Sequence, residues 1–271
     1  MNGDFCLDRY LARIGHDGVA GPDRALLAAV HAAHVNAIPF EGIDPLLRRP
    51  VKLDLASLQD KLVNRRRGGY CHEQNVLFKA ALEAMGFKVT ALGARVRWTW
   101  LPDSPLGPKE HTVLKVDLPD GSCLADVGFG ACVLDSPLAF GIDTQQHTSM
   151  GTYRLNEADG LLWLSAKRQA GWRTMYAFNL EPQIQSDIEL ANWFTSTSPL
   201  VPFTTHLVLE RVSNDKRHKV VNRRYSIEAR DGQVTVERLI SSPDELGQIL
   251  DEIFNVSPPA PVEEIFARIS G

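Results

Sequence analysis

The chain has 271 residues, of which 44% are hydrophobic and 23% are charged, and its formal net charge at pH 7 is −4. This composition is typical of a globular protein with enough chain for a large core. The weak negative charge argues against nucleic acid or an anionic membrane as partner, and no apolar run approaches the roughly 20 residues that span a bilayer. Four scattered cysteines without a CxxC pair, and an N-terminus unlike a signal peptide, favour the reducing cytoplasm over a disulfide framework or a zinc site.

The first third of the chain is predicted to be helical. Apolar residues recur at helical spacing, and glycines or a proline mark the ends of several segments. The expected helices cover residues 5–14, 25–34, 55–64 and 71–85. Together they predict a small helical bundle over residues 1–86.

The rest of the chain changes to strands and then to mixed elements. Short β-branched and aromatic runs separated by turn residues predict an antiparallel barrel or sandwich over residues 87–198. Its strands are expected at 89–100, 113–118, 123–127, 151–155, 161–166 and 172–178, followed by a helix at 184–194. Prolines then precede a third region, 199–271, with strands at 207–212, 224–229 and 233–239 and helices at 243–254 and 262–269. This order predicts an α+β fold with segregated helices and strands.

Cys71 is the leading candidate for a catalytic nucleophile. It follows the glycine pair of the segment Arg67-Gly68-Gly69-Tyr70 and stands at the start of a predicted helix. Unpaired N–H groups and the positive end of the helix dipole favour a thiolate there, and the basic run 65–67 is expected to act in the same direction. The other cysteines lack such a setting, and we interpret Cys6, Cys123 and Cys132 as packing residues.

A cysteine nucleophile needs a base and a group that orients the base. Among eight histidines, His111 opens a predicted strand directly after a loop, which suits a general base. Asp126 lies between apolar neighbours on the returning strand, where a carboxylate needs a partner, and the Nδ1–H of a histidine is a natural one. A hairpin centred on residues 120–121 would place Asp126 opposite Lys115, roughly 13 Å from His111. This simple register does not supply the contact.

Several other residues have a functional and a structural interpretation. His72 would point about 100° away from Cys71 around the helix, so we expect it to be solvent-exposed or to support the site. His31 and His34, three residues apart on a helix, lack acidic or cysteine partners for a metal, so a structural role is favoured. Gly128 and Gly130 would let the backbone approach a ligand closely.

Four sequence blocks together resemble the arylamine N-acetyltransferases over nearly the whole chain. They are R-G-G-x-C-x-E-x-N at 67–75, I-P-F-E at 38–41, D-V-G-F-G at 126–130 and A-N-W-x-T-S-T at 191–197. The resemblance implies a Cys71–His111–Asp126 triad in a core like that of cysteine proteases and transglutaminases. It also implies an N-terminal helical bundle, a central antiparallel β-barrel and a C-terminal α/β lid.

The resemblance further implies the ligand contacts. It assigns an aromatic lining for the acceptor, glycines near the acyl donor and a structural ion pair: Phe40, Tyr70, Phe129 and Phe203; Gly128 and Gly130; and Glu41 with Arg67. Two positions depart from the family pattern. Gly42 stands where the family usually has Asn or Ser, and Glu110 precedes the histidine where a small hydroxyl residue is common. The second departure bears on contacts with the donor.

The implied activity is acetyl transfer from acetyl-CoA to arylamines or arylhydrazines through an acetyl-cysteine, by a ping-pong mechanism without a metal. The enzyme is expected to act as a monomer or homodimer in the cytoplasm. A cysteine amidase or a transglutaminase-like acyltransferase would use the same triad with water or lysine as acceptor. A non-catalytic binding module of the same fold is the third alternative.

Overall fold

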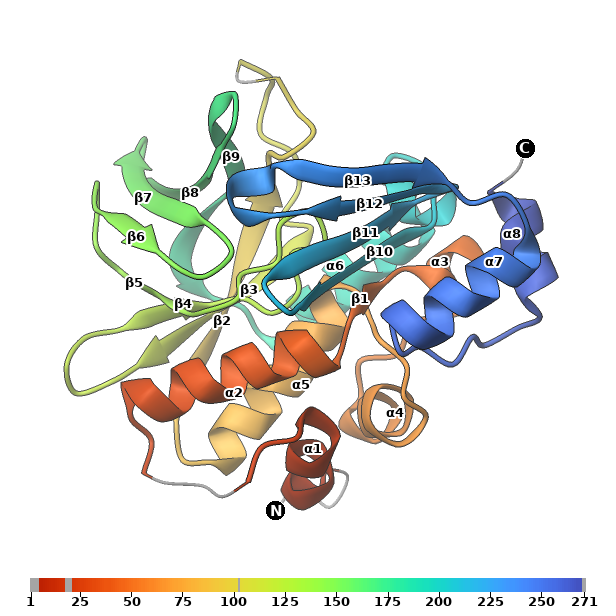
Figure 1. Cartoon of the computed structure of the whole chain (residues 1–271). Coiled ribbons are helices and arrows are strands. Elements are labelled where there is room, and N and C mark those ends of the chain that lie inside the picture. Colours follow the sequence, from red (N-terminus) through yellow and green to blue (C-terminus); the bar gives the residue numbers. More distant parts are fainter. Residues whose placement is uncertain (1–4, 18–20, 102, 270–271) are drawn as a thin grey trace.

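The computed structural model describes residues 5–17, 21–101 and 103–269. Its helices gather mainly at the N-terminal end of the chain, as Figure 1 shows. They are α1 (Leu7–Ile14), α2 (Arg24–Ala37), α3 (Ile43–Leu46), α4 (Leu55–Leu58), which continues into the π-helix η1 (Gln59–Asn64), and α5 (Cys71–Ala84). Gly15 ends α1 in the left-handed conformation at φ 66°, as a helix C-terminus favours.

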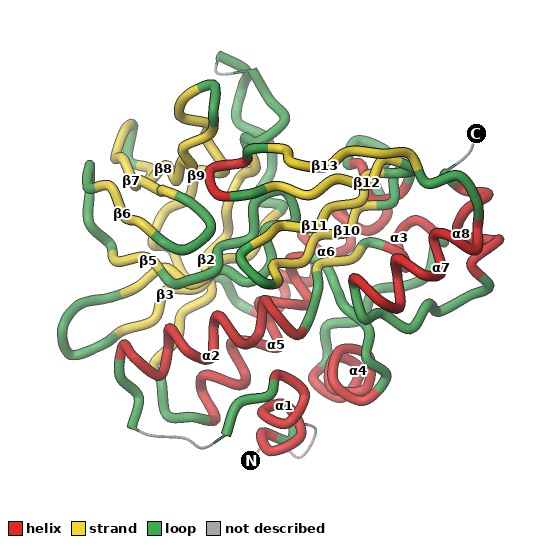
Figure 2. Tube along the Cα trace, in the orientation of Figure 1, coloured by secondary structure: helices red, strands yellow, loops and turns green. Residues whose placement is uncertain are grey.

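An eight-stranded antiparallel sheet forms the middle of the chain. Its order is β5-β4-β3-β2-β9-β8-β7-β6, so it curls toward closure between β5 and β6 (Figure 2). The strands are β2 (Lys88–Val96), β3 (His111–Asp117), β4 (Cys123–Ala125), β5 (Leu138–Ala139), β6 (Gln145–His147), β7 (Thr152–Ala158), β8 (Leu161–Arg168) and β9 (Gly171–Pro182). The Gln146 side chain on β6 bridges the gap, because its amide bonds both the N–H and the C=O of Ala139 on β5, at 2.7 and 2.9 Å.

A second sheet of five strands has the order β1-β10-β11-β12-β13. The strands are β1 (Phe40–Glu41), β10 (Val208–Ser213), β11 (Lys216–Val221), β12 (Arg224–Glu228) and β13 (Val234–Leu239). The remaining helices are α6 (Gln185–Thr197), η2 (Pro202–Thr204), η3 (Arg230–Gly232), α7 (Pro243–Gln248) with η4 (Ile249–Ile253), and α8 (Val262–Arg268). One face of this sheet shares a hydrophobic core with α3, α7, η4 and α8.

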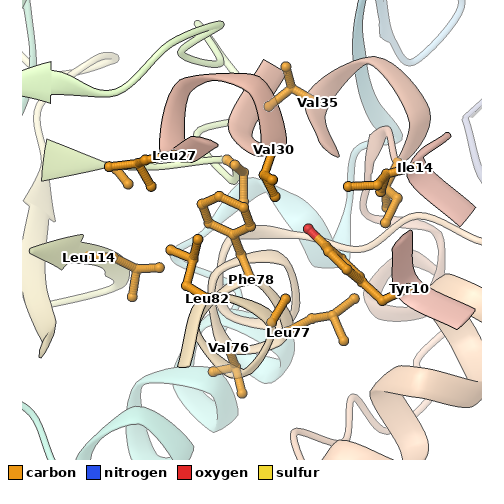
Figure 3. Packing of buried hydrophobic residues seen from close by; sticks show 14 of the residues in the cluster. Tyr10, Ile14, Leu27, Val30, Val35, Val76, Leu77, Phe78, Leu82 and Leu114 are labelled. Atoms are coloured by element: carbon orange, nitrogen blue, oxygen red, sulfur yellow. The ribbon is translucent and has the colours of Figure 1, made fainter. Parts of the chain in front are cut away.

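The largest core lies where α1, α2 and α5 pack on the eight-stranded sheet. Figure 3 shows Phe78 of α5 between side chains of α2 and β3, with Tyr10 of α1 beside Leu77. Residues of this core are fully or almost fully buried on all three helices. The helix α5, which begins at Cys71, is therefore fixed on two sides, by helices and by β3.

The expected fold class is confirmed: an α+β chain with a helical region, a barrel-like antiparallel sheet and a lid of strands and helices. One element crosses this division, because the two residues of β1 pair with β10 of the second sheet. The predicted hairpin register is wrong by two residues. Lys115 pairs with Leu124 rather than with Asp126, because the hairpin is centred one residue earlier than predicted, between Pro119 and Asp120, and β4 ends at Ala125.

Candidate active site

Cys71 is the first residue of α5 and is 5% exposed. The turn before it depends on glycine: a Cβ on Gly68 would lie 2.1 Å from the carbonyl oxygen of Pro39. Glu73, two residues into the helix, accepts a hydrogen bond from the Tyr70 N–H at 3.1 Å and so caps the first turn. The sequence block around Cys71 therefore builds a tight turn that delivers the thiol to the helix N-terminus.

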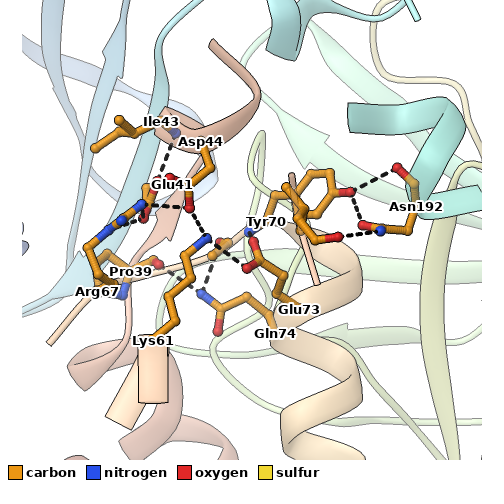
Figure 4. A network of polar contacts seen from close by, with 12 residues as sticks. Pro39, Glu41, Ile43, Asp44, Lys61, Arg67, Tyr70, Glu73, Gln74 and Asn192 are labelled. Atoms are coloured by element: carbon orange, nitrogen blue, oxygen red, sulfur yellow. Dashed lines mark hydrogen bonds and ion pairs between the residues drawn. The ribbon is translucent and has the colours of Figure 1, made fainter. Parts of the chain in front are cut away.

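A network of buried ion pairs supports the turn at residues 68–70 (Figure 4). Arg67 Nε donates to Glu41 Oε1 at 2.8 Å, and Lys61 Nζ lies 2.6 Å from Asp44 Oδ2 and 2.7 Å from Glu73 Oε1. Burial would lower the pKa of Lys61, but the surrounding carboxylates raise it above its usual range. Lys61, Arg67 and Glu73 also line a cavity of about 530 Å³ whose lining does not include Cys71.

Gln74 connects the same turn to the helical core. Its amide nitrogen donates to the carbonyls of Pro39 and Gly69 at 2.8 and 3.2 Å. Its oxygen therefore accepts from His34 Nε2 at 2.7 Å, which leaves His34 Nδ1 to accept from the Tyr10 hydroxyl at 2.7 Å. Burial lowers the pKa of His34 to about 3, so these two hydrogen bonds are made by a neutral imidazole.

The other histidine of the metal hypothesis, His31, is also fully buried, and burial lowers its pKa to about 4. Within residues 5–17, 21–101 and 103–269, no group of three or more His, Cys, Asp or Glu side chains is placed to hold a metal ion. Both histidines lie beside the Phe78 ring, at centroid distances of 5.6 and 5.1 Å.

His111 and Asp126 meet directly, with 2.7 Å between His111 Nε2 and Asp126 Oδ2. The prediction that Nδ1 makes this bond is wrong; because Nε2 donates to the carboxylate, Nδ1 carries the free lone pair. The contact is possible because the shifted register brings Asp126 closer to His111 and because the chain leaves β4 at Ala125.

Asn75 and a backbone N–H complete the surroundings of the carboxylate. Asn75 Nδ2 and the Gly128 N–H both donate to Asp126 Oδ1 at 2.9 Å. Burial would raise the pKa of Asp126, but these donors and His111 hold it below its usual value. Asn75 had no role in the sequence prediction. Its position one helical turn after Cys71, on the same face, was the available signal.

The Cys71 sulfur lies against the backbone on either side of His111. It is 3.8 Å from the Glu110 carbonyl oxygen, and the Thr112 N–H points toward it from the next residue. Burial raises the pKa of Cys71, and the charge of Asp126 acts in the same direction, whereas the backbone N–H groups of His72 and Thr112 oppose the rise. The helix N-terminus thus acts as expected, but it does not by itself stabilise a thiolate.

The expected contribution of the basic run is wrong, because its side chains pair elsewhere. Arg65 forms an ion pair with Asp60 at 2.7 Å, Arg66 bonds Asn255, and Arg67 is held by Glu41. These side chains stabilise the loop rather than the thiolate.

Glycines at 128 and 130 are required by close packing. A Cβ on Gly128 would lie 2.8 Å from the Cα of Cys71, and one on Gly130 would lie 2.4 Å from the Phe40 ring. The segment that carries Asp126 is therefore packed tightly against both Cys71 and β1. This packing explains the two glycines without a ligand.

The four aromatic candidates divide into two groups. Phe203 lies 5.8 Å from Phe40 and 5.7 Å from Tyr70 between ring centroids, and this trio packs around Cys71. Phe129 belongs to a different cluster, 5.3 Å from the His111 ring. An aromatic wall thus lies beside the sulfur, and a separate ring lies beside the imidazole.

The structure decides two expectations about individual side chains. Of the two alternatives for His72, solvent exposure is wrong: the side chain is fully buried, because α5 is covered on this side by β3 and α6. Its ring nitrogens lie 2.8 Å from Thr112 Oγ1, beside His111, and 3.3 Å from Thr195 Oγ1. Cys6 is exposed rather than a packing residue, while Cys123 and Cys132 are buried. The terminal position of Cys6, directly before α1, leaves it outside the core.

Comparisons with known proteins agree with this architecture. A family model described as N-acetyltransferase matches residues 24–260. The arylamine N-acetyltransferase of Mycolicibacterium smegmatis is 40% identical over 252 residues, which cover 92% of this chain and 90% of that protein. The arylamine N-acetyltransferase of Escherichia coli (strain K12) is 34% identical over 250 residues, with coverage of 92% and 88%.

Solved structures show the same similarity in three dimensions. The arylamine N-acetyltransferase of Mycobacterium marinum in complex with CoA has a TM-score of 0.92 and 35% identity, with coverage of 97% of this chain and 98% of that one. The Mycobacterium tuberculosis arylamine N-acetyltransferase gives a TM-score of 0.92 at 34% identity, with coverage of 98% and 100%. Fold and sequence together define an N-acetyltransferase. Within that class, the chain belongs to the arylamine N-acetyltransferase family.

Proposed function

We propose that the chain transfers an acetyl group from acetyl-CoA to an arylamine or arylhydrazine, with Cys71 as nucleophile, His111 as general base and acid, and Asp126 as the group that orients the base. One observation carries the proposal: the 2.7 Å bond between His111 Nε2 and Asp126 Oδ2. His111 stands between Glu110 and Thr112, whose backbone groups face the Cys71 sulfur. Family membership supports the same reaction.

In the first half-reaction the Cys71 proton moves to His111 Nδ1, and the sulfur attacks the thioester carbonyl of acetyl-CoA. The C–S bond to CoA then breaks, and the departing thiolate takes the proton back from the imidazolium. We propose that an N–H at the start of α5 stabilises the oxyanion, an effect typically worth about 3 kcal/mol per donor. CoA and Cys71 are both thiols, so this step is close to balanced.

The electrostatics of the site support a Cys71 thiolate that forms together with a His111 imidazolium rather than a permanent, unpaired thiolate. Burial raises the pKa of Cys71, so an isolated thiolate is unfavourable there. Proton transfer to His111 creates an imidazolium between the thiolate and Asp126, which compensates both anions. Asp126 is suited to this role because its own pKa is held low by three donors.

In the second half-reaction the neutral arylamine attacks the acetyl-cysteine, and His111 removes the amine proton and returns it to the sulfur. Phe40, Tyr70 and Phe203 are proposed to line the acceptor site, since they surround Cys71. Phe129 is proposed to contact the acceptor from the imidazole side. Gly128 and Gly130 remain proposed neighbours of the donor, and the Glu41–Arg67 pair is proposed to be structural.

The remaining parts of the proposal concern organisation and setting. We propose three units, 1–86, 87–198 and 199–271, that supply the nucleophile, the base with its carboxylate, and the lid. We also propose a cytoplasmic monomer or homodimer without nucleic-acid or membrane partners, on the basis of charge and cysteine distribution. No helix within the described part of the chain is long and apolar enough to cross a membrane.

A product assay tests this proposal against an amidase or transglutaminase-like activity. The protein is incubated with acetyl-CoA, and free CoA is measured with and without an arylamine panel. Cys71→Ser serves as the inactive variant, and the exposed Cys6→Ser as the matched thiol control. We expect amine-dependent CoA release and acetylated amine, abolished in the first variant alone. Release that yields only acetate would show a hydrolase instead.

A further inference from the structure

The inner face of the second sheet carries a buried cluster of alternating charges. Glu210 on β10 is directly opposite Lys219 on β11, and Arg217 on β11 is directly opposite Glu228 on β12, so all four side chains share one face. Their side chains are 0%, 15%, 1% and 9% exposed, in that order. Lys219 Nζ lies 3.1 Å from Glu228 Oε1, and Arg217 also forms an ion pair with Glu210.

The opposite face of the sheet is apolar where it packs against the C-terminal helices. Leu209, Val220 and Tyr225 occupy neighbouring register positions there and pack with the C-terminal helices. Buried charges are costly unless their partners and hydrogen bonds are complete. The charged face therefore requires its own explanation.

That face binds the backbone of the segment that follows Asp126. Glu210 Oε1 accepts from the Val133 N–H at 2.7 Å, and Arg217 Nη1 donates to the Val133 carbonyl at 3.0 Å. Lys219 Nζ donates to the Ala131 carbonyl at 2.9 Å. The segment 126–133 has little regular structure of its own, so these side chains supply the partners that its buried peptide groups need.

The held segment reaches the reacting groups within a few residues. The N–H groups of Ala131 and Cys132 donate to the Phe129 carbonyl at 2.8 and 3.0 Å, which closes a tight turn. Phe129 packs on the His111 ring, and Gly128 lies against Cys71. Movement of Ala131 would thus be transmitted to the imidazole and to the carboxylate that orients it.

We propose that Lys219, within the Glu210–Arg217–Lys219–Glu228 cluster, is a positioning residue for acetyl transfer: it fixes the 129–132 turn and, through Phe129, the His111 imidazole. This inference rests on the proposed function. In this proposal the second sheet helps to align His111 by holding the 129–132 turn.

Lys219→Met is the informative variant because it leaves both acids paired. Glu228 keeps Arg168, whose Nη2 lies 2.6 Å from Glu228 Oε2, and Glu210 keeps Arg217. Lys219→Arg retains a donor and serves as the conservative rescue. Lys216→Met is the matched control, since Lys216 is exposed on the same strand.

Two rates are measured on each folded variant, with the melting temperature recorded in parallel: acetylation of Cys71 by acetyl-CoA, and alkylation of Cys71 by iodoacetamide across pH. We expect Lys219→Met to slow acetylation by about 10- to 100-fold and to shift the alkylation profile. Lys219→Arg should stay within about threefold of wild type, because its guanidinium can still donate to the Ala131 carbonyl and keep the His111 imidazole in place. Lys216→Met should match wild type in both assays.

The proposal is overturned if Lys219→Met acetylates at the wild-type rate, if its alkylation profile is unshifted, or if Lys219→Arg is equally impaired. A lowered melting temperature with unchanged rates would show a merely structural role and would also overturn it. Failure of the wild-type protein to acetylate would refute the proposed function instead, while the alkylation comparison would still test the positioning role.

Discussion

Replacement of Asp126 by asparagine should leave the fold intact and nearly abolish acetyl transfer. The asparagine oxygen can still accept from Asn75 and from the Gly128 N–H, which bond Oδ1 at 2.9 Å. The new amide group would then face His111 Nε2 with a donor, so the imidazole must place its proton on Nδ1. In that tautomer Nδ1 cannot take the Cys71 proton. Loss of the orienting carboxylate in such triads costs about 10³- to 10⁴-fold, or roughly 4–5.5 kcal/mol of activation free energy.

The assay is single-turnover release of CoA from acetyl-CoA, followed by rapid mixing with a thiol reagent. Asp135→Asn provides a matched control, because Asp135 is a buried carboxylate that bonds Thr148 and Ser149 away from the site. We expect the folded control to stay within about threefold of the wild-type rate, equivalent to about 0.7 kcal/mol, because the bonds of Asp135 do not involve His111 or Cys71. Loss of these buried hydrogen bonds should lower its stability instead. An Asp126→Asn rate within about tenfold of wild type, equivalent to about 1.4 kcal/mol, would refute the assigned role of the carboxylate.

Three further predictions address packing, the acceptor site and pH. Gly128→Ala should inactivate the enzyme and cost about 1–3 kcal/mol of stability, since its Cβ would lie 2.8 Å from the Cys71 Cα, whereas Gly107→Ala meets nothing within 4 Å and should be neutral in activity and thermal melts. Phe203→Ala should raise the KM for arylamines without slowing acetyl-enzyme formation; a change confined to acetyl-enzyme formation would contradict the lining role. Stability should be constant between about pH 7 and 8 and fall as pH drops below about 6. The cause is that the buried side chains of His31, His34 and His72 have pKa values of about 4, 3 and 3 in the folded protein. These values lie below the ~6.5 of the unfolded chain, which therefore binds more protons. A melting temperature unchanged down to pH 5 would contradict this.

Most of the helices and strands that could be predicted are marked by patterns within short stretches of the sequence. The helix that begins at Cys71 was predicted because apolar spacing, a glycine turn and a terminal glycine are all contained within about twenty residues. The strands β7, β8 and β9 were likewise predicted as short runs separated by Gly160 and Gly171. These signals depend on neighbours in sequence.

Features that depend on tertiary contacts were missed. One missed element is β11, whose sequence Lys-Arg-His-Lys-Val-Val at 216–221 begins with four basic residues and does not indicate a buried strand. The strand can be buried because Arg217 and Lys219 pair with acids on β10 and β12 and bond the backbone of 131–133. The exposure of His72 could not be judged from helix geometry alone, since α6 approaches from more than one hundred residues away. The predicted hairpin register was wrong because the Asp-Gly pair does not mark the centre of the hairpin, which lies between Pro119 and Asp120.

The most direct test of the proposed mechanism is the intact mass of the protein after incubation with acetyl-CoA and no acceptor, before and after an arylamine is added. We expect a single acetyl group, mapped to Cys71 and absent from Cys71→Ala, that is discharged on addition of the amine as acetylated product forms. Acetylated product without any acetyl-enzyme, or an acetyl group on another residue that is discharged at the same rate, would contradict it.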